Sequence, residues 1–202
     1  MVAARDGKGH RMSTAPATLR KTVIVVDMLN GFCRFGNLAS PRLDSVTERI
    51  RGHLEREVEE GADLVFLADT HAPDDPEFAM FPPHCVEGSG EEEIVPELTA
   101  FAERGHVVRK RRYSGFYGTD LDELLRRLRP DVVEVVGVCT DICVMHTVAG
   151  LRDRDYEVVV RADMVATYDA LGHAGDEIDR FALDHMRDVL GARVEGAAAD
   201  GR

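Results

Sequence analysis

The sequence predicts an α/β protein, a single domain built as a three-layer α/β/α sandwich around a mostly parallel six-stranded sheet. Short runs rich in valine and isoleucine alternate along the chain with stretches whose apolar side chains recur at helical spacing. The chain has 202 residues, enough to bury one sizeable core, and shows neither an internal repeat nor a linker-like segment. Such alternation favours parallel strands with helices on both faces of the sheet.

The first half of the chain supplies two of the predicted strands. Residues 23–26 form an apolar, β-branched run that predicts the first strand. Residues 43–60 repeat apolar side chains at helical spacing and end before a glycine, which predicts a helix. The run at 63–68 predicts the second strand, and the proline- and glycine-rich stretch at 69–90 predicts a long loop. A proline then opens a predicted helix over 96–104.

The second half repeats the alternation with shorter connections. The β-branched runs are bounded by proline, glycine or charged residues, as buried strands commonly are. We therefore predict strands at residues 106–109, 131–136, 156–161 and 192–195. Helical spacing of apolar residues predicts helices at 119–129, 140–153 and 176–190.

The two ends of the chain differ in composition from the rest. Residues 1–21 are rich in glycine, alanine and arginine without periodicity, which predicts a disordered N-terminal tail. Within that tail Met12 is an alternative translation start to Met1. Residues 22–196 are predicted to form the folded domain, and residues 197–202 a disordered C-terminal tail.

Charge and hydropathy argue against several classes of protein. The formal net charge is −12, so we expect neither a nucleic-acid partner nor an anionic membrane surface. No apolar run reaches the length of a transmembrane helix, and the N-terminus lacks the apolar segment of a signal peptide. The 4 cysteines are too few for a disulfide scaffold. We therefore expect a cytoplasmic protein in a reducing compartment.

The segment at 137–143 links the predicted strand at 131–136 to the helix that follows. Thr140 is a suitable N-cap for that helix, which places Cys143 in its first turn. Unpaired backbone N–H groups and the positive end of the helix dipole favour a thiolate there, and the thiolate is the nucleophilic form of cysteine. A small buried core cysteine is the alternative.

Asp27 closes the first predicted strand. In parallel α/β folds ligands bind beyond the carboxyl ends of strands, so a polar residue there is a candidate for the site. Residues 28–30 are not the glycine-rich turn that a dinucleotide-binding oxidoreductase needs, and Leu29 stands where an aspartyl phosphatase usually has a second aspartate. Capping of a following helix is the alternative role for Asp27.

Lys110 follows the third predicted strand. Of the 25 basic residues, only Lys8, Lys21 and Lys110 are lysines, and Lys110 is the only one inside the predicted domain. Its neighbours Arg109 and Arg111 show that arginine is tolerated locally, so a compact ammonium group is indicated at this position. A solvated basic cluster is the alternative.

Side chains that can bind a metal ion follow the second predicted strand. Asp69 and His71, two residues apart, can converge on one ion, and the long loop adds Glu77 and His84. Such a mixed nitrogen and oxygen donor set suits zinc or another divalent metal. Cys85 is a further candidate ligand, although adjacent side chains rarely reach one ion together. A solvated acidic face is the alternative for Asp74, Asp75 and Glu77.

Together these motifs resemble the isochorismatase-like cysteine hydrolases, which have a Rossmann-like fold. The resemblance spans residues 22–195 and is carried by Asp27, by Lys110 in KRRYSGFYGTDL, and by Cys143 in GVCTDICV. The block with DTH at its start and FPPH at its end resembles the metal site of the nicotinamidase (pyrazinamidase) branch. The segment FALDHMRDVLGA is similar to the C-terminal part of compact bacterial nicotinamidases.

The resemblance implies a role for each residue of the catalytic group. Cys143 is expected to be the nucleophile, Asp27 the acid and base, and Lys110 the cation that supports the thiolate. The peptide bond between Val138 and Cys139 is expected to be cis, with the backbone N–H groups of Cys139 and Cys143 forming an oxyanion hole. Cys139 is the alternative nucleophile.

The resemblance also implies a cofactor and a substrate pocket. One divalent metal ion, Zn²⁺ first with Fe²⁺ or Mn²⁺ as alternatives, is expected on Asp69, His71 and His84. Glu77 would be a fourth ligand, as in some members of the family. Phe32, Phe81 and Tyr113 match positions that line the pyridine pocket, and ordinary core packing is the alternative for these aromatics.

The implied activity is that of a nicotinamidase acting in NAD salvage. Nicotinamide, a small carboxamide, is expected to be hydrolysed to nicotinate and ammonia through a cysteine thioester, by a protein that forms a homo-oligomer. Two alternatives remain open. One is another amide or ureide hydrolase of the same superfamily with a vestigial metal block, and the other is a catalytically silent binding or scaffold protein.

Overall fold

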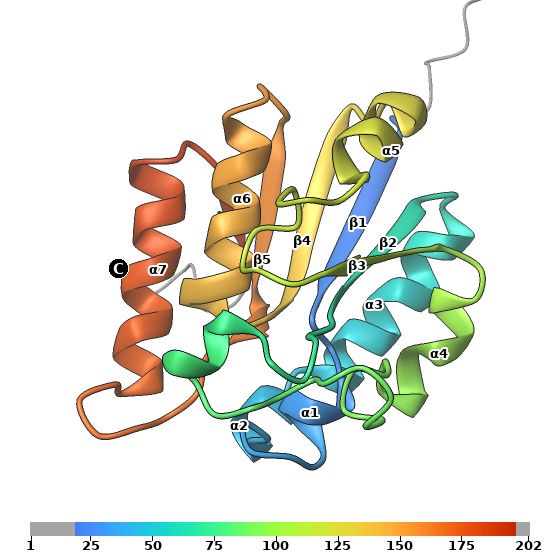
Figure 1. The fold of residues 1–202 in the computed structure, drawn as a ribbon. Coiled ribbons are helices and arrows are strands. Elements are labelled where there is room, and N and C mark those ends of the chain that lie inside the picture. The colour runs from blue at the N-terminus through green and yellow to red at the C-terminus, as the bar shows by residue number, and fades with distance from the viewer. Residues whose placement is uncertain (1–18, 197–202) are drawn as a thin grey trace, which may run out of the picture.

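Six parallel strands form the central sheet of residues 19–196, the part of the chain that this computed structural model describes (Figure 1). The strand order is β3-β2-β1-β4-β5-β6, and every neighbouring pair runs parallel. Helices cover both faces of the sheet, so the predicted fold class is confirmed. The predicted tails lie outside the described residues, apart from residues 19–21.

Apart from the end of β5, the strands begin and end within two residues of the predicted positions. Their bounds are β1 Lys21–Val26, β2 Asp63–Asp69, β3 His106–Lys110, β4 Val132–Val138, β5 Val158–Ala166 and β6 Arg193–Glu195. Lys21, predicted to belong to the tail, is the first residue of β1 and pairs with Val132 of β4. The prediction that Lys110 is the only lysine of the folded region is therefore wrong.

Two groups of helices bury the two faces of the sheet. One face is covered by α1 Asn30–Cys33, α2 Pro41–Asp44, α3 Thr47–Glu59 and α4 Pro96–Ala102. The other is covered by α5 Leu121–Leu128, a π-helical turn η2 at Thr140–Val144, α6 Met145–Arg152 and α7 Gly175–Asp188. The short 3₁₀ helix η1 Pro76–Ala79 lies in the long loop.

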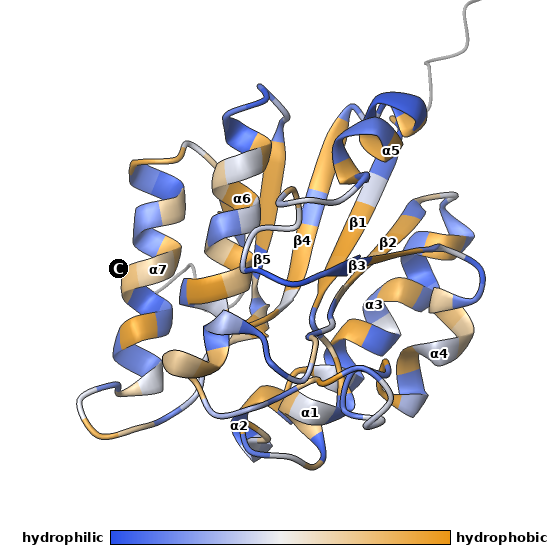
Figure 2. Ribbon diagram, in the orientation of Figure 1, coloured by the Kyte–Doolittle hydropathy of each residue, from blue (hydrophilic) through white to orange (hydrophobic). Residues whose placement is uncertain are grey.

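The alternation of side chains along β1 shows why two cores form. Val23 and Val25 point into the core under α3 and α4, whereas Ile24 and Val26 point into the core under α5 and α6. Both sets are buried, which is why the strand is a continuous apolar run and not an alternating one. Figure 2 shows the apolar strands between helices whose outer faces are hydrophilic.

The helix predicted at 43–60 is two helices in the structure. The Ser45 hydroxyl donates to the Arg42 carbonyl, and the Thr47 hydroxyl donates to the Asp44 carboxylate. Side chains that bond locally in this way compete with the helical hydrogen bonds, so the chain breaks between α2 and α3. The strand predicted at 156–161 also differs, because β5 continues to Ala166.

The carboxyl ends of the strands meet at one edge, where Gly137 allows a close approach. A Cβ at Gly137 would lie 2.1 Å from the Val26 carbonyl oxygen, and the residue has φ +114°, so only glycine fits there. The residue after Val26 is thereby held beside the end of β4. Residues that follow β1, β2, β3 and β4 therefore converge on one place.

Candidate active site

Lys110 lies at the centre of the polar group at this edge. Its ammonium nitrogen is 2.8 Å from Asp27 Oδ2 and 3.3 Å from Asp69 Oδ1. The same nitrogen is 3.5 Å from Cys143 Sγ. All four side chains are buried, and the structure brings the predicted catalytic residues Asp27, Lys110 and Cys143 together.

The strand ends explain how these side chains meet. Lys110 and Asp69 are the last residues of neighbouring strands and are partners in the register. Asp27 has φ +49°, a left-handed conformation that is uncommon for residues other than glycine and that aspartate adopts more readily than most. The Asp69 backbone N–H donates to Asp27 Oδ1 at 3.0 Å, which orients the carboxylate toward Lys110.

Burial and mutual charge set the protonation of this group. Burial raises the pKa of Asp27 to about 6, against the opposing effect of Lys110. Burial disfavours charge on Lys110, but Asp27 and Asp69 outweigh it and raise the pKa of the lysine. Burial also raises the pKa of the Cys143 thiol, despite Lys110. The helix start was predicted to favour a thiolate, whereas in the structure burial dominates and the resting group is a thiol.

Asp69, His71, Glu77 and His84 form a second group, here called the pocket cluster. One donor atom from each lies within 4.8 Å of the others, and all four side chains are buried. His71 Nε2 is 3.0 Å and His84 Nε2 is 3.5 Å from Asp69 Oδ2, and His84 Nε2 is 4.0 Å from Glu77 Oε1. Four such atoms at this spacing fit around one divalent ion.

The far nitrogen of each histidine in the pocket cluster lies beside an oxygen atom. His71 Nδ1 lies 3.2 Å from Asp75 Oδ2, and Asp75 is held by Arg112 at 2.9 Å. His84 Nδ1 lies 2.9 Å from the Pro82 carbonyl oxygen. With Nδ1 protonated in both rings, each Nε2 presents its lone pair to the cluster, which is the arrangement found for metal-binding histidines.

The charge around the pocket cluster also fits a cation. The carboxylates that meet there are Asp27, Asp69, Asp75 and Glu77, and the ion-paired cations among the described residues are Lys110 and Arg112. Burial and the charge of Asp69 raise the pKa of Glu77, as expected where negative charge is in excess. A divalent ion would balance this excess, so the donor set fits the metal implied by the sequence.

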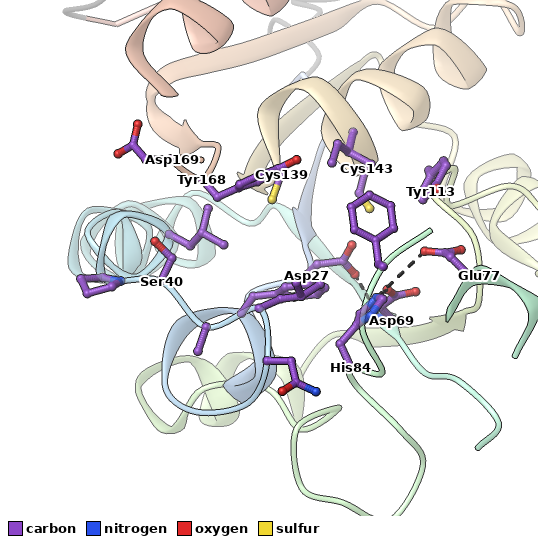
Figure 3. A pocket seen from close by; sticks show the side chains of 18 residues that line it. Asp27, Ser40, Asp69, Glu77, His84, Tyr113, Cys139, Cys143, Tyr168 and Asp169 are labelled. Carbon is purple, nitrogen blue, oxygen red and sulfur yellow. Dashed lines mark hydrogen bonds and ion pairs between the residues drawn. The ribbon is translucent and has the colours of Figure 1, made fainter. Parts of the chain in front are cut away.

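A cavity of about 370 Å³ opens onto both groups (Figure 3). Asp27, Cys143, Asp69, Glu77 and His84 line it, as do the predicted pocket aromatics Phe32, Phe81 and Tyr113. Phe81 packs edge-on against both His84 and Tyr113, with ring centroids 6.2 and 6.5 Å apart. These rings can enclose a planar aromatic ligand beside the thiol.

Other lining residues were not found by sequence reasoning. Ser40 and Asn37 come from the segment before α2, and Tyr168 and Asp169 follow β5. Tyr168 and Asp169 could have been found from the apolar run Met164-Val165-Ala166, because this run extends β5 past the predicted strand end. Asp75 was also missed as a site residue. It is 6% exposed, and Glu77 is 3% exposed, so the solvated acidic face is wrong for both, whereas Asp74 is exposed.

Three further expectations can be compared with the structure. The peptide bond between Val138 and Cys139 is cis, as expected. The helical turn begins at Thr140 with Cys139 in the capping position and without a side-chain cap, so the Thr140 cap is wrong. The first turn is π-helical, and the Val144 N–H reaches the Cys139 carbonyl at 3.1 Å. Cys85 is not part of the pocket cluster, since its Sγ is directed at the Glu91 carbonyl.

An all-parallel α/β/α sandwich with a polar pocket at the carboxyl ends of its strands is characteristic of a broad class of α/β enzymes. Within that class the chain belongs to the isochorismatase family, because the isochorismatase domain matches residues 21–197. It is an amidohydrolase of that family.

Two curated relatives cover most of the chain. The isochorismatase family protein PncA of Bacillus subtilis is 32% identical over 187 residues, which are 87% of this chain and 99% of the relative. Nicotinamidase 1 of Arabidopsis thaliana is 31% identical over 192 residues, which cover 83% of this chain and 78% of the relative.

Solved structures give the same picture. The pyrazinamidase/nicotinamidase of Streptococcus mutans superposes with a TM-score of 0.79 at 31% identity, covering 87% of this chain and 99% of that one. The N-carbamoylsarcosine amidase of Thermoplasma acidophilum has a TM-score of 0.76 at 34% identity, covering 88% and 96%. The pyrazinamidase of Pyrococcus horikoshii, solved in complex with zinc, has a TM-score of 0.77 at 27% identity, covering 88% and 99%.

No helix within residues 19–196 is both long and apolar enough to cross a membrane. All 4 cysteines lie in this range, are buried and are free.

Proposed function

We propose that this chain is a nicotinamidase, which hydrolyses nicotinamide to nicotinate and ammonia in NAD salvage. The observation that carries the proposal is the position of the Lys110 ammonium, 2.8 Å from Asp27 Oδ2 and 3.5 Å from Cys143 Sγ beside the pocket cluster. Nicotinamidase relatives at 31% identity support the choice of substrate. A reducing compartment is supported by the free thiols.

Acylation requires a proton acceptor because the resting group is a thiol. Asp27 takes the Cys143 proton as the sulfur attacks the carboxamide carbon, and Lys110 balances the charge that develops on the sulfur and on the carboxylate. The backbone N–H groups of Cys139 and Cys143 receive the developing oxyanion, and each such donor stabilises it by roughly 3–4 kcal/mol. Asp27 then returns the proton to the amide nitrogen, ammonia leaves, and a Cys143 thioester remains.

Deacylation uses the same groups in reverse. Asp27, again a carboxylate, accepts a proton from a water molecule that attacks the thioester carbonyl carbon. The carbon–sulfur bond breaks, the proton held by Asp27 returns to the Cys143 sulfur, and the nicotinic acid formed loses its carboxyl proton to solvent and leaves as nicotinate. A pKa of about 6 lets Asp27 act as a base in one step and as an acid in the next at neutral pH.

Asp69, His71, Glu77 and His84 would hold the divalent metal ion. A bound ion would supply a Lewis-acidic position for the nitrogen of a pyridine ring. A donor set of two histidines and two carboxylates suits Zn²⁺, and it also suits Fe²⁺ or Mn²⁺. The aromatic rings of Phe32, Phe81 and Tyr113 line the cavity and would enclose the pyridine ring.

A second candidate is hydrolysis of a ureide. The 34% identity to an N-carbamoylsarcosine amidase favours it, because that similarity is as high as the similarity to nicotinamidases. Ureides carry the same carboxamide-type carbon that Cys143 would attack.

The test is ammonia release from nicotinamide by metal-loaded protein, with Cys143→Ala and a chelator as comparisons. Turnover should vanish in the variant and fall with the chelator, while Cys33→Ala, which removes a buried thiol outside the pocket, keeps it. Activity retained by Cys143→Ser would instead identify Cys139 as the nucleophile.

Absence of nicotinamide turnover would reject this substrate. Turnover of N-carbamoylsarcosine would then support ureide hydrolysis as the function. A Cys143 that resists alkylation at neutral pH, in a protein that turns over neither substrate, would indicate a silent binding or scaffold protein.

A further inference from the structure

The segment after β5 forms a small closed loop beside the pocket, here called the pocket-wall loop (residues 168–173). The Ala170 N–H donates to the His173 carbonyl and the His173 N–H donates to the Ala170 carbonyl, both at 2.9 Å. Tyr168 and Asp169 at its start line the cavity, and Leu171 at its tip is fully exposed. Tyr168 packs against the core under α3 and α4, His173 is half-buried, and the residues between them are exposed.

His173 supplies the contact that the tip lacks. Its ring stacks on the ring of Tyr168, with centroids 4.1 Å apart and planes 5° from parallel. His173 Nδ1 lies 2.9 Å from the Tyr168 carbonyl oxygen, and Nε2 lies 3.1 Å from Asp141 Oδ2. Both partners can only accept, so both bonds form only when the ring carries a proton on each nitrogen.

Asp141 belongs to η2, the turn that carries Cys143. Its second carboxylate oxygen accepts a hydrogen bond from the Thr167 hydroxyl at 2.5 Å. The Asp141 carboxylate thus binds Thr167, just before the pocket-wall loop, and His173 at the end of the loop, and His173 is the partner of the two whose own side chain can be charged. We propose that His173, as an imidazolium, is a positioning residue that clamps the pocket-wall loop onto η2 and so fixes the Tyr168 wall of the pocket.

The surrounding charges support this assignment. From η2 the ring faces Asp141, and the nearby carboxylates of the loop and α7 already have partners. Asp169 accepts from the Gly175 N–H at 2.7 Å, and Asp176 and Asp179 are ion-paired with Arg42 of α2. Arg42 also donates to the Thr167 carbonyl at 2.8 Å. Asp141 is therefore the carboxylate that stabilises the charged ring.

The sign of the pH dependence follows from the same contacts. Partial burial disfavours charge on the ring, but the bonds to Asp141 and to the Tyr168 carbonyl outweigh it and raise the pKa of His173. The clamp is complete below that pKa and loses one hydrogen bond as pH rises through it. The Asp27, Lys110 and Cys143 contacts do not include the loop, so the expected effect is on substrate binding.

The inference uses the proposed activity for one of its two tests. With nicotinamide as the probe, His173→Gln should raise KM about tenfold at pH 6, the size expected for one lost hydrogen bond to a charged group, with kcat within about threefold. The ratio of KM in the variant to KM in the wild type should fall toward 1 as pH rises through the His173 pKa. Other groups titrate in the same way in both proteins, so their effects on KM cancel in this ratio. His106→Gln, at the exposed start of β3, is the matched control and should leave KM unchanged.

The second test needs no turnover. In histidine-labelled protein followed by NMR, the His173 ring should titrate above an ordinary histidine, and Asp141→Asn should lower its midpoint. A midpoint that Asp141→Asn does not move overturns the proposal, and so does a KM ratio that stays constant with pH. If the wild type releases no ammonia from nicotinamide, the proposed activity fails while the NMR titration still decides the clamp.

Discussion

Two buried clusters in this molecule offer the same kinds of metal ligand at different ends of the sheet. The pocket cluster lies at the carboxyl ends of the strands. The second, here called the strand-start cluster, consists of His53 and Glu57 of α3 and Glu134 of β4. In both clusters the donor atoms lie within 4.8 Å of one another and every side chain is buried.

The two clusters differ in the balance between their carboxylates and the cations around them. In the strand-start cluster Lys21 Nζ lies 2.6 Å from Glu57 Oε2, and Arg161 Nη1 lies 4.0 Å from Glu134 Oε2. Its two carboxylates are therefore paired with two cations, of which Arg161 is shared with Glu195 at 3.3 Å. The adjoining cavity of about 310 Å³ is lined by Glu195 and also by Arg56 and Arg193, so its cations outnumber its carboxylates and disfavour the approach of another cation. Around the pocket cluster four carboxylates share two cations, and a divalent ion restores balance.

The comparison teaches that ligand types at the right spacing do not by themselves make a metal site. The strand-start cluster is a compensated structural network, whereas the pocket cluster carries uncompensated charge and opens onto a cavity beside a thiol. This view predicts opposite responses to matched substitutions in the two clusters.

Removing one histidine from each cluster should give the largest contrast. His84→Ala should abolish stoichiometric metal binding and most nicotinamide turnover, since it removes a ligand and a wall of the pocket. His53→Ala should leave metal content unchanged but lower the free energy of unfolding by about 1–3 kcal/mol, because the buried Glu134 carboxylate loses its hydrogen-bond partner and keeps only the longer contact with Arg161. Metal per chain and urea unfolding measure the two effects.

This prediction is wrong if both variants lose the same amount of metal, or if only His53→Ala loses metal. Either result would place an ion in the strand-start cluster and refute the charge argument.

A smaller effect is expected from the contact behind His71. Asp75→Asn should weaken metal binding about 10–100-fold, the range seen when the outer partner of a metal-binding histidine is altered. Asp74→Asn is the matched control, because Asp74 is the exposed neighbour with the same charge. Competition with a chromophoric chelator measures both affinities. Equal affinities in the two variants would mean that Asp75 contributes only through its charge.

The residues that sequence reasoning brought together are those that follow strands. Asp27, Asp69, Lys110 and Cys143 were candidates because carboxyl ends of parallel strands meet at one edge, and apolar runs locate those ends. Loop residues carry no periodic signal. His71, Glu77 and His84 were candidates through their residue types and the spacing of His71 from Asp69, and the resemblance then supported them as a metal site. Asp75 was assigned to a solvent-facing surface because nothing in the sequence shows how the loop folds back.

Other misses have physical causes that can be named. Arg161 and Asp163 interrupt the apolar pattern of β5, so the predicted strand ended five residues early and Tyr168 was not placed at the pocket. Glu134 lies within an otherwise apolar strand, and its charge is hidden by partners distant in the chain. Lys21 looked like part of a polar tail, although its ion pair with Glu57 anchors the start of β1. Such pairings are tertiary and leave no local signature.

The smallest expected effect comes from changing Lys21 in the strand-start cluster. Lys21→Met removes one of the two cations that balance the strand-start cluster and should lower the free energy of unfolding by about 1–2 kcal/mol. This is less than for a fully buried pair, because the Lys21 side chain is 25% exposed. Lys21→Arg keeps the charge and should behave like the wild type.

The same variant should also begin to bind a cation where the wild type does not. In protein whose pocket cluster is already loaded with metal, added Zn²⁺ should raise the Tm of Lys21→Met by a few degrees and leave the wild type and Lys21→Arg unchanged. The gain should disappear when His53→Ala is added, because the ligand is then missing. If Zn²⁺ stabilises all these proteins equally, the two clusters do not differ in their charge balance, and the distinction between them must rest on access to the cavity alone.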